Sequence, residues 1–339
     1  MVITVLLFIL GLLLLIKGGD WFVDGATGIA HKFHVPEILI GATVVSIGTT
    51  LPEVMVSATS AVQGYGSMAY GNAIGSIICN TALIAAITVA IKPSEAPRKS
   101  MVIPIIFFFT AAGIYAVAAY TTGNFTRIMG AGLLIIFASY MIILIAQAKK
   151  EISLAKAQGT APSGAKEAAK DANEEEKESP LWKDIVLLIV GASLITVGAN
   201  LLVDNGTKIA EALGVPQTVI ALTFVALGTS LPELVTAITS LAKGHGALSL
   251  GNIIGANLFN LVLVSGVSIT LAPFKLPAEK TINFLGKVRN ASLVMDLPLV
   301  FIVMGILTIP TLIIGKLKRW QGIVLLAIYV CYCAFQFVG

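Results

Sequence analysis

The sequence predicts an all-α polytopic membrane protein with ten transmembrane helices in two inverted-topology repeats of five. Three observations carry this prediction: the composition, the number of apolar runs, and a motif that occurs twice. The chain has 339 residues, 57% of them hydrophobic and 12% charged, and its mean hydropathy is +0.93. Soluble proteins carry about 25% charged residues. The apolar runs reach the roughly 20 residues that a spanning helix needs, and they lack the alternation of barrel strands.

Ten apolar segments follow one another along the chain. They lie near residues 1–19, 38–62, 67–91, 101–120, 127–147, 182–203, 216–242, 246–272, 291–314 and 320–338. The first resembles a signal-peptide core. It has no basic leader and no Ala-x-Ala cleavage site, so we expect it to be the first span.

A polar stretch divides the ten segments into two groups of five. Residues 148–180 are rich in Ala, Glu, Lys and Gly, which predicts a water-exposed, mostly disordered linker. We therefore expect a first five-helix repeat at 1–147, a cytoplasmic linker at 148–180 and a second five-helix repeat at 181–339.

An internal repeat relates the two groups. Gly-Thr-Thr-Leu-Pro-Glu at residues 48–53 returns as Gly-Thr-Ser-Leu-Pro-Glu at 228–233, and residues 18–93 align without a gap on 198–273. Because an odd number of spans separates equivalent positions, the second copy should enter the membrane in the opposite direction. Inverted repeats are typical of secondary transporters, whose sites lie near the bilayer midplane.

Each copy of the motif places a carboxylate in the middle of a span. An acidic side chain at a helix centre costs roughly 2.5–3.5 kcal/mol on insertion scales, and no Lys or Arg lies in the spans of Glu53 and Glu233. Protonation or a bound cation would lower that cost. Two carboxylates with neutral oxygens suit Ca²⁺, which takes 6–8 oxygen ligands.

The residues around the two acids are expected to supply neutral oxygens. Pro52 and Pro232 should break their helices, because proline lacks an amide hydrogen and clashes with the preceding turn. Unwound backbone is tolerated at membrane depth where it lines a cavity. The carbonyls expected to be released lie near Ser46, Thr49, Ala226 and Thr229. The hydroxyls expected to act as further ligands are those of Thr49, Thr50, Thr229 and Ser230.

A second block, at residues 71–80 and 251–260, follows each motif. Its glycines recur every four residues, which predicts close helix packing. We interpret Asn72 and Asn252 as residues that cap or bridge helices. Asn80 and Asn260, eight residues further on, are expected to contact an ion or a carboxylate.

The remaining polar residues give little sign of other chemistry. Asp296 is expected to be an interfacial or helix N-terminal acid. His31 and His34 lie in a loop without a third ligand, so no resident metal is expected. The sequence shows no catalytic constellation, no cofactor motif and no nucleic-acid signal. We expect a monomer, in a lipid bilayer, that is not an enzyme.

Loop charges suggest the orientation. With the N-terminus outside, the inside loops hold more Lys and Arg than the outside loops, although the cluster at 275–289 argues the other way. Both termini are therefore expected outside and the linker in the cytoplasm.

The two motif pairs make the chain resemble the calcium/cation antiporter superfamily, and in particular the prokaryotic sodium/calcium exchangers of the cell membrane. The resemblance covers nearly the whole chain. It implies ten helices, four ion sites among the second, third, seventh and eighth spans, and first and sixth spans that slide past the others. It also implies alternating-access exchange of Ca²⁺ for Na⁺.

Carried over by motif position, the resemblance implies that Glu53 and Glu233 share a calcium ion, with Thr49 and Thr229 as further ligands. The sodium sites would draw on Ser46, Thr50, Ser76, Asn80, Ala226 and Ser230. Two positions depart from the archaeal exchanger pattern, which has Asp where this chain has Asn260 and Ser where it has Ala256. Potassium-dependent exchangers also have Asp at the first position, so Asn260 argues for potassium independence.

Two other functions stay open at the level of the sequence. Loss of the hydroxyl at Ala256 weakens an expected sodium site, so an antiporter of Ca²⁺ or another divalent cation against H⁺ is the main alternative. The chain lacks the Gly-Asn-x-x-Glu pattern of calcium/proton exchangers, which weakens that alternative without removing it. A cation channel would suit an acidic ring. A single pair of acids from two repeats disfavours a channel.

Overall fold

The computed structural model describes residues 1–33, 35–93, 95–96, 98–157, 180–213, 228–278, 281–284 and 286–338. These residues form two compact units. One contains residues 1–49 and 145–252, and the other contains residues 50–144 and 253–339. Helices α3 (Ser46–Val62), α7 (Arg127–Ala157) and α13 (Gly246–Phe259) run from one unit into the other.

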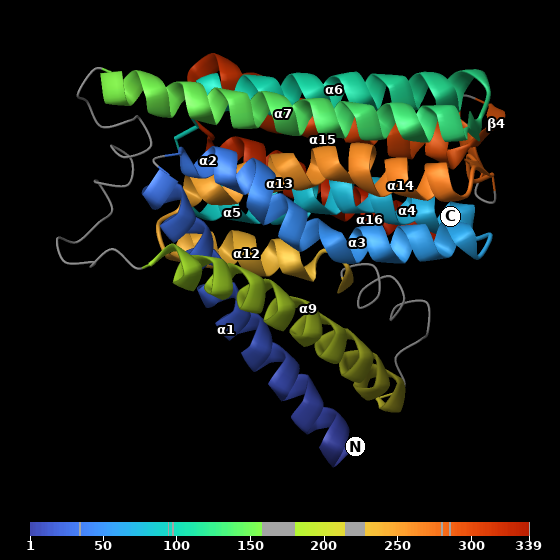
Figure 1. The fold of residues 1–339 in the computed structure, drawn as a ribbon. Coiled ribbons are helices and arrows are strands. Elements are labelled where there is room, and N and C mark those ends of the chain that lie inside the picture. Colours follow the sequence, from blue (N-terminus) through green and yellow to red (C-terminus); the bar gives the residue numbers. More distant parts are fainter. Residues whose placement is uncertain are drawn as a thin grey trace. The chain divides into compact units, whose positions relative to one another are not determined.

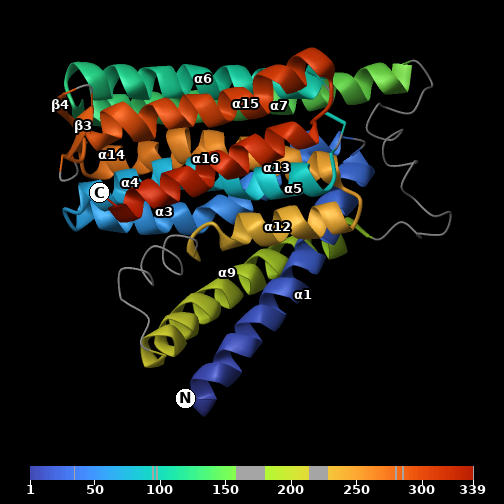
Figure 2. The same cartoon turned by 180° about the vertical axis from the view of Figure 1, so that it is seen from behind.

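The described residues are mainly helical (Figures 1 and 2). Eight helical runs in them are long and apolar enough to cross a membrane: Val2–Phe33, Glu37–Val62, Gly66–Ile91, Arg98–Thr121, Arg127–Lys150, Leu181–Ile209, Gly246–Leu271 and Ser292–Ile314. Two further apolar helices are α12 (Leu231–Ala242) and α16 (Arg319–Val338). The predicted polytopic helical membrane fold is therefore confirmed. The count of ten stays a prediction, since residues 216–227 of the seventh segment lie outside the described residues.

Several helices are longer than their predicted spans. Helix α1 runs Val2–Phe33 and α9 runs Leu181–Ala212, and each is about 48 Å long at 1.5 Å per residue. Helix α7 continues to Ala157, inside the stretch predicted as linker. The reason is composition, because Ala, Lys and Glu are strong helix formers that extend a helix into water. The rest of that stretch, residues 158–179, lies outside the described residues.

Helices α1 and α9 form an antiparallel pair in the first unit, side by side in both views of the fold. A Cβ added at Gly11 would lie 2.9 Å from the Gly198 carbonyl oxygen, and one added at Gly18 would lie 3.0 Å from that of Gly191. The residue numbers fall on one helix as they rise on the other, so the helices run in opposite directions. Only glycine permits this approach of the two backbones.

The local structure repeats with the sequence. Helix α4 (Gly66–Cys79) is followed by a π-helical segment, η2 (Asn80–Ala85), and by α5 (Ala86–Ile91). The second copy has α13, then η4 (Asn260–Val264), then α14 (Ser265–Leu271). Both π-helical segments therefore begin at the equivalent asparagines. Further π-helical segments are η1 (Gly41–Val45), which follows α2 (Glu37–Ile40), and η5 (Ser292–Asp296).

The second unit also contains four short strands among the described residues. Helix α6 (Arg98–Thr121) leads to β1 (Asn124–Phe125), which pairs with β2 (Phe274–Lys275). Strands β3 (Thr281–Phe284) and β4 (Lys287–Asn290) form an antiparallel hairpin before η5 and α15 (Leu297–Ile314). Helix α16 packs against α5 and η2.

Candidate functional site

Glu53 lies inside α3, where its side chain is fully buried. The expected helix break at Pro52 is wrong, because α3 continues through this residue. In apolar surroundings an unwound segment would leave several backbone groups unpaired, whereas a proline within a continuous helix removes one amide hydrogen. The irregular backbone lies upstream, in η1. There the Ser46 hydroxyl donates to the Gly41 carbonyl oxygen at 2.7 Å.

Glu233 occupies a different backbone setting. Helix α12 begins at Leu231, so Pro232 lies in the first turn, where a missing amide hydrogen costs little. The helix boundary predicted at Pro232 is therefore confirmed, with a turn at Thr229 and Ser230 inside the second motif directly before α12. Glu233 is fully buried in the first turn of α12, where unpaired amide groups and the helix dipole favour a negative charge.

The predicted ligands are deeply placed. All but Ala226 lie within the described residues, and of those all are buried except Thr229, which is half-buried. Several of their buried polar atoms have no hydrogen-bond partner among the described residues: Thr50 Oγ1, Ser230 Oγ, both amide atoms of Asn80, and Asn260 Oδ1. Buried polar atoms are normally paired. Oxygens left without a partner in this way are suited to hold a cation.

The π-helical segments orient these asparagines. Asn80 and Asn260 are the first residues of η2 and η4. The Asn260 amide nitrogen donates to the Ala256 carbonyl oxygen at 3.1 Å, and the Ser265 hydroxyl donates to the Asn260 carbonyl oxygen at 3.0 Å. The amide nitrogen of Asn260 is thereby engaged with backbone, while its side-chain oxygen stays available.

The structure brings together part of the predicted set in each unit. In the first unit, Ser46 and Thr49 lie against Asn252. In the second, the Asn72 amide nitrogen donates to the Glu53 carbonyl oxygen at 3.3 Å and to the Ser57 hydroxyl at 2.8 Å. The helix-bridging interpretation of Asn72 and Asn252 is thus confirmed. Glu53 and Glu233 belong to different units, so their predicted meeting stays a prediction.

The predicted glycine packing holds in one place. A Cβ added at Gly251 would lie 2.2 Å from the Ile38 carbonyl oxygen, so α13 packs directly on α2. At Gly71 and Gly75 no described residue lies within 4 Å of an added Cβ, and close packing finds no support there.

The second unit contains a buried polar cluster that the sequence did not predict. The Asn257 amide nitrogen lies 2.7 Å from the Thr81 hydroxyl and 3.2 Å from the Met304 sulfur, and Asn257 is fully buried. Its counterpart in the first repeat is Ile77, so a comparison of the repeats gave no signal. A signal was present in the second block itself, which contains an additional asparagine.

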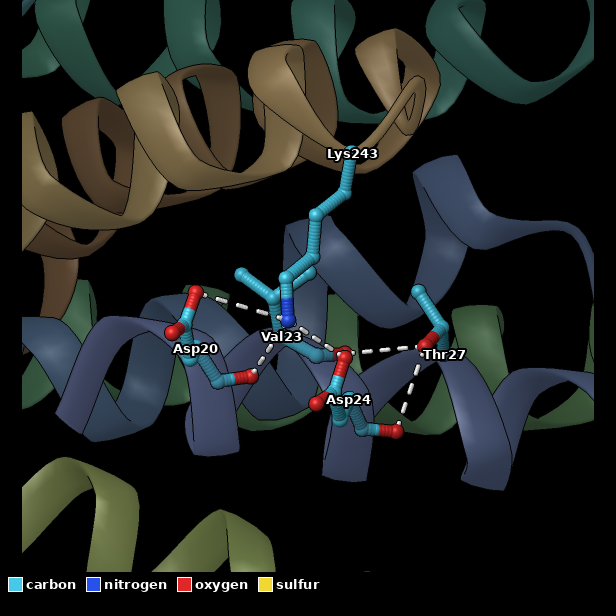
Figure 3. A network of polar contacts seen from close by, with 5 residues as sticks. All are labelled: Asp20, Val23, Asp24, Thr27 and Lys243. Carbon is cyan, nitrogen blue, oxygen red and sulfur yellow. Dashed lines mark hydrogen bonds and ion pairs between the residues drawn. The ribbon is translucent and has the colours of Figure 1, made fainter. Parts of the chain in front are cut away.

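Charged residues of the first unit form ion pairs that the sequence did not single out. Lys243, at the end of α12, lies 2.6 Å from Asp24 Oδ1 and 3.6 Å from Asp20 Oδ1 on α1 (Figure 3). Lys32 on α1 lies 3.6 Å from Asp184 on α9. His245 Nδ1 lies 2.9 Å from Glu37 Oε1, and His31 Nε2 lies 3.7 Å from the same oxygen. The contacts of Lys243, Lys32 and His31 hold α1 against its neighbours, whereas the contact of His245 joins the start of α13 to α2.

Two other predicted positions are less informative. Asp296 directly precedes α15 and accepts a hydrogen bond from the Tyr332 hydroxyl at 3.3 Å. His34 lies outside the described residues. Among the described residues, no group of three or more His, Cys, Asp or Glu side chains is arranged to hold a metal ion.

A helical membrane protein whose deepest polar side chains are carboxylates, hydroxyls and amides has the features of a cation-transport protein. A family model described as sodium/calcium exchanger protein matches residues 3–146 and 183–338. An uncharacterized membrane protein of Methanocaldococcus jannaschii is 33% identical over 341 residues, covering 98% of this chain and 97% of that protein.

A second relative and a solved structure are similar to this chain over nearly its whole length, and both are sodium/calcium exchangers by name. The sodium/calcium exchanger MaX1 of Methanosarcina acetivorans is 31% identical over 358 residues, covering 99% of both chains. A structure of the sodium-calcium exchanger NCX_Mj, soaked with 2.5 mM Na⁺ and 10 mM Sr²⁺, matches with a TM-score of 0.75 at 32% identity, covering 98% of both chains. The chain belongs to the sodium/calcium exchanger family. It is a multi-pass cell-membrane protein and a cation antiporter.

Proposed function

We propose that this chain exchanges Ca²⁺ for Na⁺ across a prokaryotic plasma membrane by alternating access and without K⁺. The observation that carries the proposal is the pair of fully buried carboxylates, Glu53 and Glu233, at equivalent positions of a repeated motif. MaX1 and NCX_Mj are both named as sodium/calcium exchangers, which supports Na⁺ and Ca²⁺ as the two exchanged ions.

In this proposal Glu53 and Glu233 hold one calcium ion, with Thr49 and Thr229 as further oxygen ligands. Burial of both acids and the chemistry of their neighbours support this assignment, because Ca²⁺ prefers carboxylate, hydroxyl and carbonyl oxygens. The sodium ligands proposed are Ser46, Thr50, Ser76, Asn80, Ala226 and Ser230. The unpartnered atoms of Thr50, Asn80 and Ser230 support their inclusion.

Charge explains why such a carrier would exchange ions. Two bare carboxylates are costly to move through a dry barrier, so the empty carrier switches faces rarely. One Ca²⁺ or several Na⁺ neutralise the pair and remove that cost. Because each loaded form switches readily and the empty form only rarely, movement of one ion is tied to countermovement of the other.

We propose ten spans in inverted repeats as the frame for this cycle. The antiparallel α1 and α9 support the proposal. Gly11 and Gly18 are the repeat equivalents of Gly191 and Gly198, and Gly11 faces Gly198 while Gly18 faces Gly191. A reciprocal contact of this kind is what a two-fold axis produces. We further propose that both termini lie outside, that the linker predicted at residues 148–180 is cytoplasmic, and that the monomer works in the bilayer without a cofactor.

Calcium flux in proteoliposomes tests the proposal. Vesicles loaded with Na⁺ and diluted into sodium-free buffer should take up calcium, and K⁺ should make no difference. Glu53→Gln and Glu233→Gln should each abolish this uptake, whereas Asp296→Asn, outside the proposed site, should retain it. Sodium-driven uptake that survives both glutamine substitutions would exclude the assignment.

The second candidate is antiport of Ca²⁺, or another divalent cation, against H⁺. It is favoured by Asn260 and Ala256, which offer the proposed sodium sites one carboxylate and one hydroxyl fewer than the archaeal pattern. A pH gradient in sodium-free buffer separates the two. Calcium uptake driven by protons alone would favour this candidate, and dependence on Na⁺ would exclude it.

A further inference from the structure

Asn252 contacts two of the proposed ligands, Ser46 and Thr49, yet it has no part in the proposed coordination. It is fully buried on α13, in the same unit as Ser46 and Thr49. Its side-chain oxygen lies 3.3 Å from the Ser46 hydroxyl and 3.3 Å from the Thr49 hydroxyl. Its carbonyl oxygen lies 2.9 Å from the Ser46 hydroxyl.

Close backbone packing fixes the position of this asparagine. A Cβ added at Gly41 would lie 2.4 Å from the Leu248 carbonyl oxygen and 2.8 Å from the backbone nitrogen of Asn252. At Gly251, the neighbour of Asn252, an added Cβ would lie 2.2 Å from the Ile38 carbonyl oxygen. The backbone of α13 therefore touches the backbone of α2 and η1. This contact leaves the Asn252 side-chain oxygen little freedom to move away from the Ser46 and Thr49 hydroxyls.

The chemistry of a hydroxyl explains why this contact matters. A hydroxyl has one proton and two lone pairs, and a cation binds a lone pair while repelling the proton. The amide oxygen can only accept. The Thr49 proton therefore points to Asn252 Oδ1, since its other acceptor, the Ser46 carbonyl oxygen, lies at 3.5 Å. The Ser46 proton is turned toward the carbonyl oxygens of Gly41 and Asn252.

We propose that Asn252 is a positioning residue whose side-chain oxygen turns the Thr49 hydroxyl proton away from the transported cation, so that the lone pairs of that hydroxyl face the ion. This inference rests on the proposed function of Thr49 as a ligand. The repeat equivalent, Asn72, acts differently, because its amide nitrogen donates to the Glu53 carbonyl oxygen and to Ser57. The role therefore belongs to one repeat.

The test compares the full-length chain and its variants in proteoliposomes, with calcium titrated at a saturating sodium gradient. Asn252→Leu keeps the volume and removes the acceptor, so the half-saturating calcium concentration should rise about fivefold to tenfold, the range of one hydrogen bond, with the maximal rate within about twofold. Asn252→Gln keeps a neutral amide oxygen and should raise that concentration less than Asn252→Leu does. Ser249→Ala, which removes a buried hydroxyl from the same helix, should change neither quantity.

A double-mutant cycle with Thr49→Val separates positioning from packing. In the Thr49→Val background, Asn252→Leu should add less than about a twofold rise, because the hydroxyl it orients is gone. If Asn252→Leu does not fold, Asn252→Ala takes its place with the same expectations. Three results would each overturn the inference. The first is an unchanged half-saturating concentration in Asn252→Leu, and the second is a loss in that variant confined to the maximal rate. The third is a double variant in which the fold-changes of Asn252→Leu and Thr49→Val simply multiply, as independent effects do. If wild-type vesicles move no calcium against sodium, the proposed function fails instead, and the same cycle is run with the cation they exchange.

Discussion

At the scale of single residues, the number of acidic side chains in the proposed site sets how much positive charge the bound ions must supply. In the proposed calcium site, Glu53 and Glu233 would together supply two negative charges, which match one Ca²⁺. Asn260 is a neutral amide whose side-chain oxygen has no hydrogen-bond partner among the described residues. An acid at residue 260 would add a third charge at membrane depth. That charge would need a further monovalent cation or a proton.

Asn260→Asp tests this charge balance. Calcium exchange by the variant should become dependent on a monovalent ion, rising with added K⁺ or Na⁺ or with lower pH, because each route neutralises the third acid. Calcium-for-calcium exchange in vesicles, with K⁺ replaced by a bulky organic cation, measures this. Asn260→Ala is the control, since it removes the amide without adding charge. Exchange by Asn260→Asp that is as insensitive to these ions as wild type would contradict the charge balance.

At the element scale, the two copies of one motif have different backbones. Pro52 lies within the continuous helix α3, whereas Pro232 lies in the first turn of α12. A proline within a helix leaves the carbonyl four residues earlier without its amide partner, here that of Gly48. In the first turn of a helix a proline removes no hydrogen bond, because the amide hydrogens there have no acceptor within the helix. The effects of replacing the two prolines should therefore differ.

Pro52→Ala should raise the free energy of unfolding by about 1–3 kcal/mol, because it restores a helix hydrogen bond and removes a clash. Pro232→Ala is the matched control and should change it by less than about 0.5 kcal/mol, since the first turn has no such bond to gain. Thermal unfolding in detergent without Na⁺ or Ca²⁺ compares them. Equal shifts for the two variants would show that α3 is interrupted after all.

The contact of α1 with α9 gives a second prediction for elements. A Cβ at Gly191 would lie 2.5 Å from the Phe22 amide nitrogen, so Gly191→Ala should force the helices apart and cost about 1–3 kcal/mol. Gly132 on α7 has nothing within 4 Å of an added Cβ among the described residues, so Gly132→Ala should gain up to about 1 kcal/mol from helix propensity. Melting temperatures in detergent that fall for both, or for neither, would contradict this packing.

At the scale of the whole molecule, hydropathy predicts the helical membrane fold because a spanning helix must be apolar along its length. It does not predict helix ends. Residues 148–157 read as linker by polarity and yet extend α7, since helix propensity does not require burial. The repeat predicts the candidate ligands, because the acids and asparagines return at one spacing.

The remaining features of the site depend on tertiary contacts. Pro52 and Pro232 are equivalent in sequence, and only the surrounding helix decides whether the backbone breaks. Asn72 and Asn252 are equivalent too, but one donates to the Glu53 carbonyl oxygen and the other accepts from hydroxyls. Asn257 was hidden because its counterpart is Ile77. A repeat therefore predicts which residue types gather, while the partner of each one depends on packing that differs between copies.

We propose that Glu53 and Glu233 together hold a single transported calcium ion. Calorimetric titration of calcium into the purified, sodium-free protein in detergent measures how many ions the chain binds. We predict one ion per wild-type chain and loss of binding in Glu53→Gln and in Glu233→Gln alike, because either acid alone cannot balance the charge. Single variants that each still bind calcium with wild-type affinity and stoichiometry would show that the two carboxylates do not share an ion.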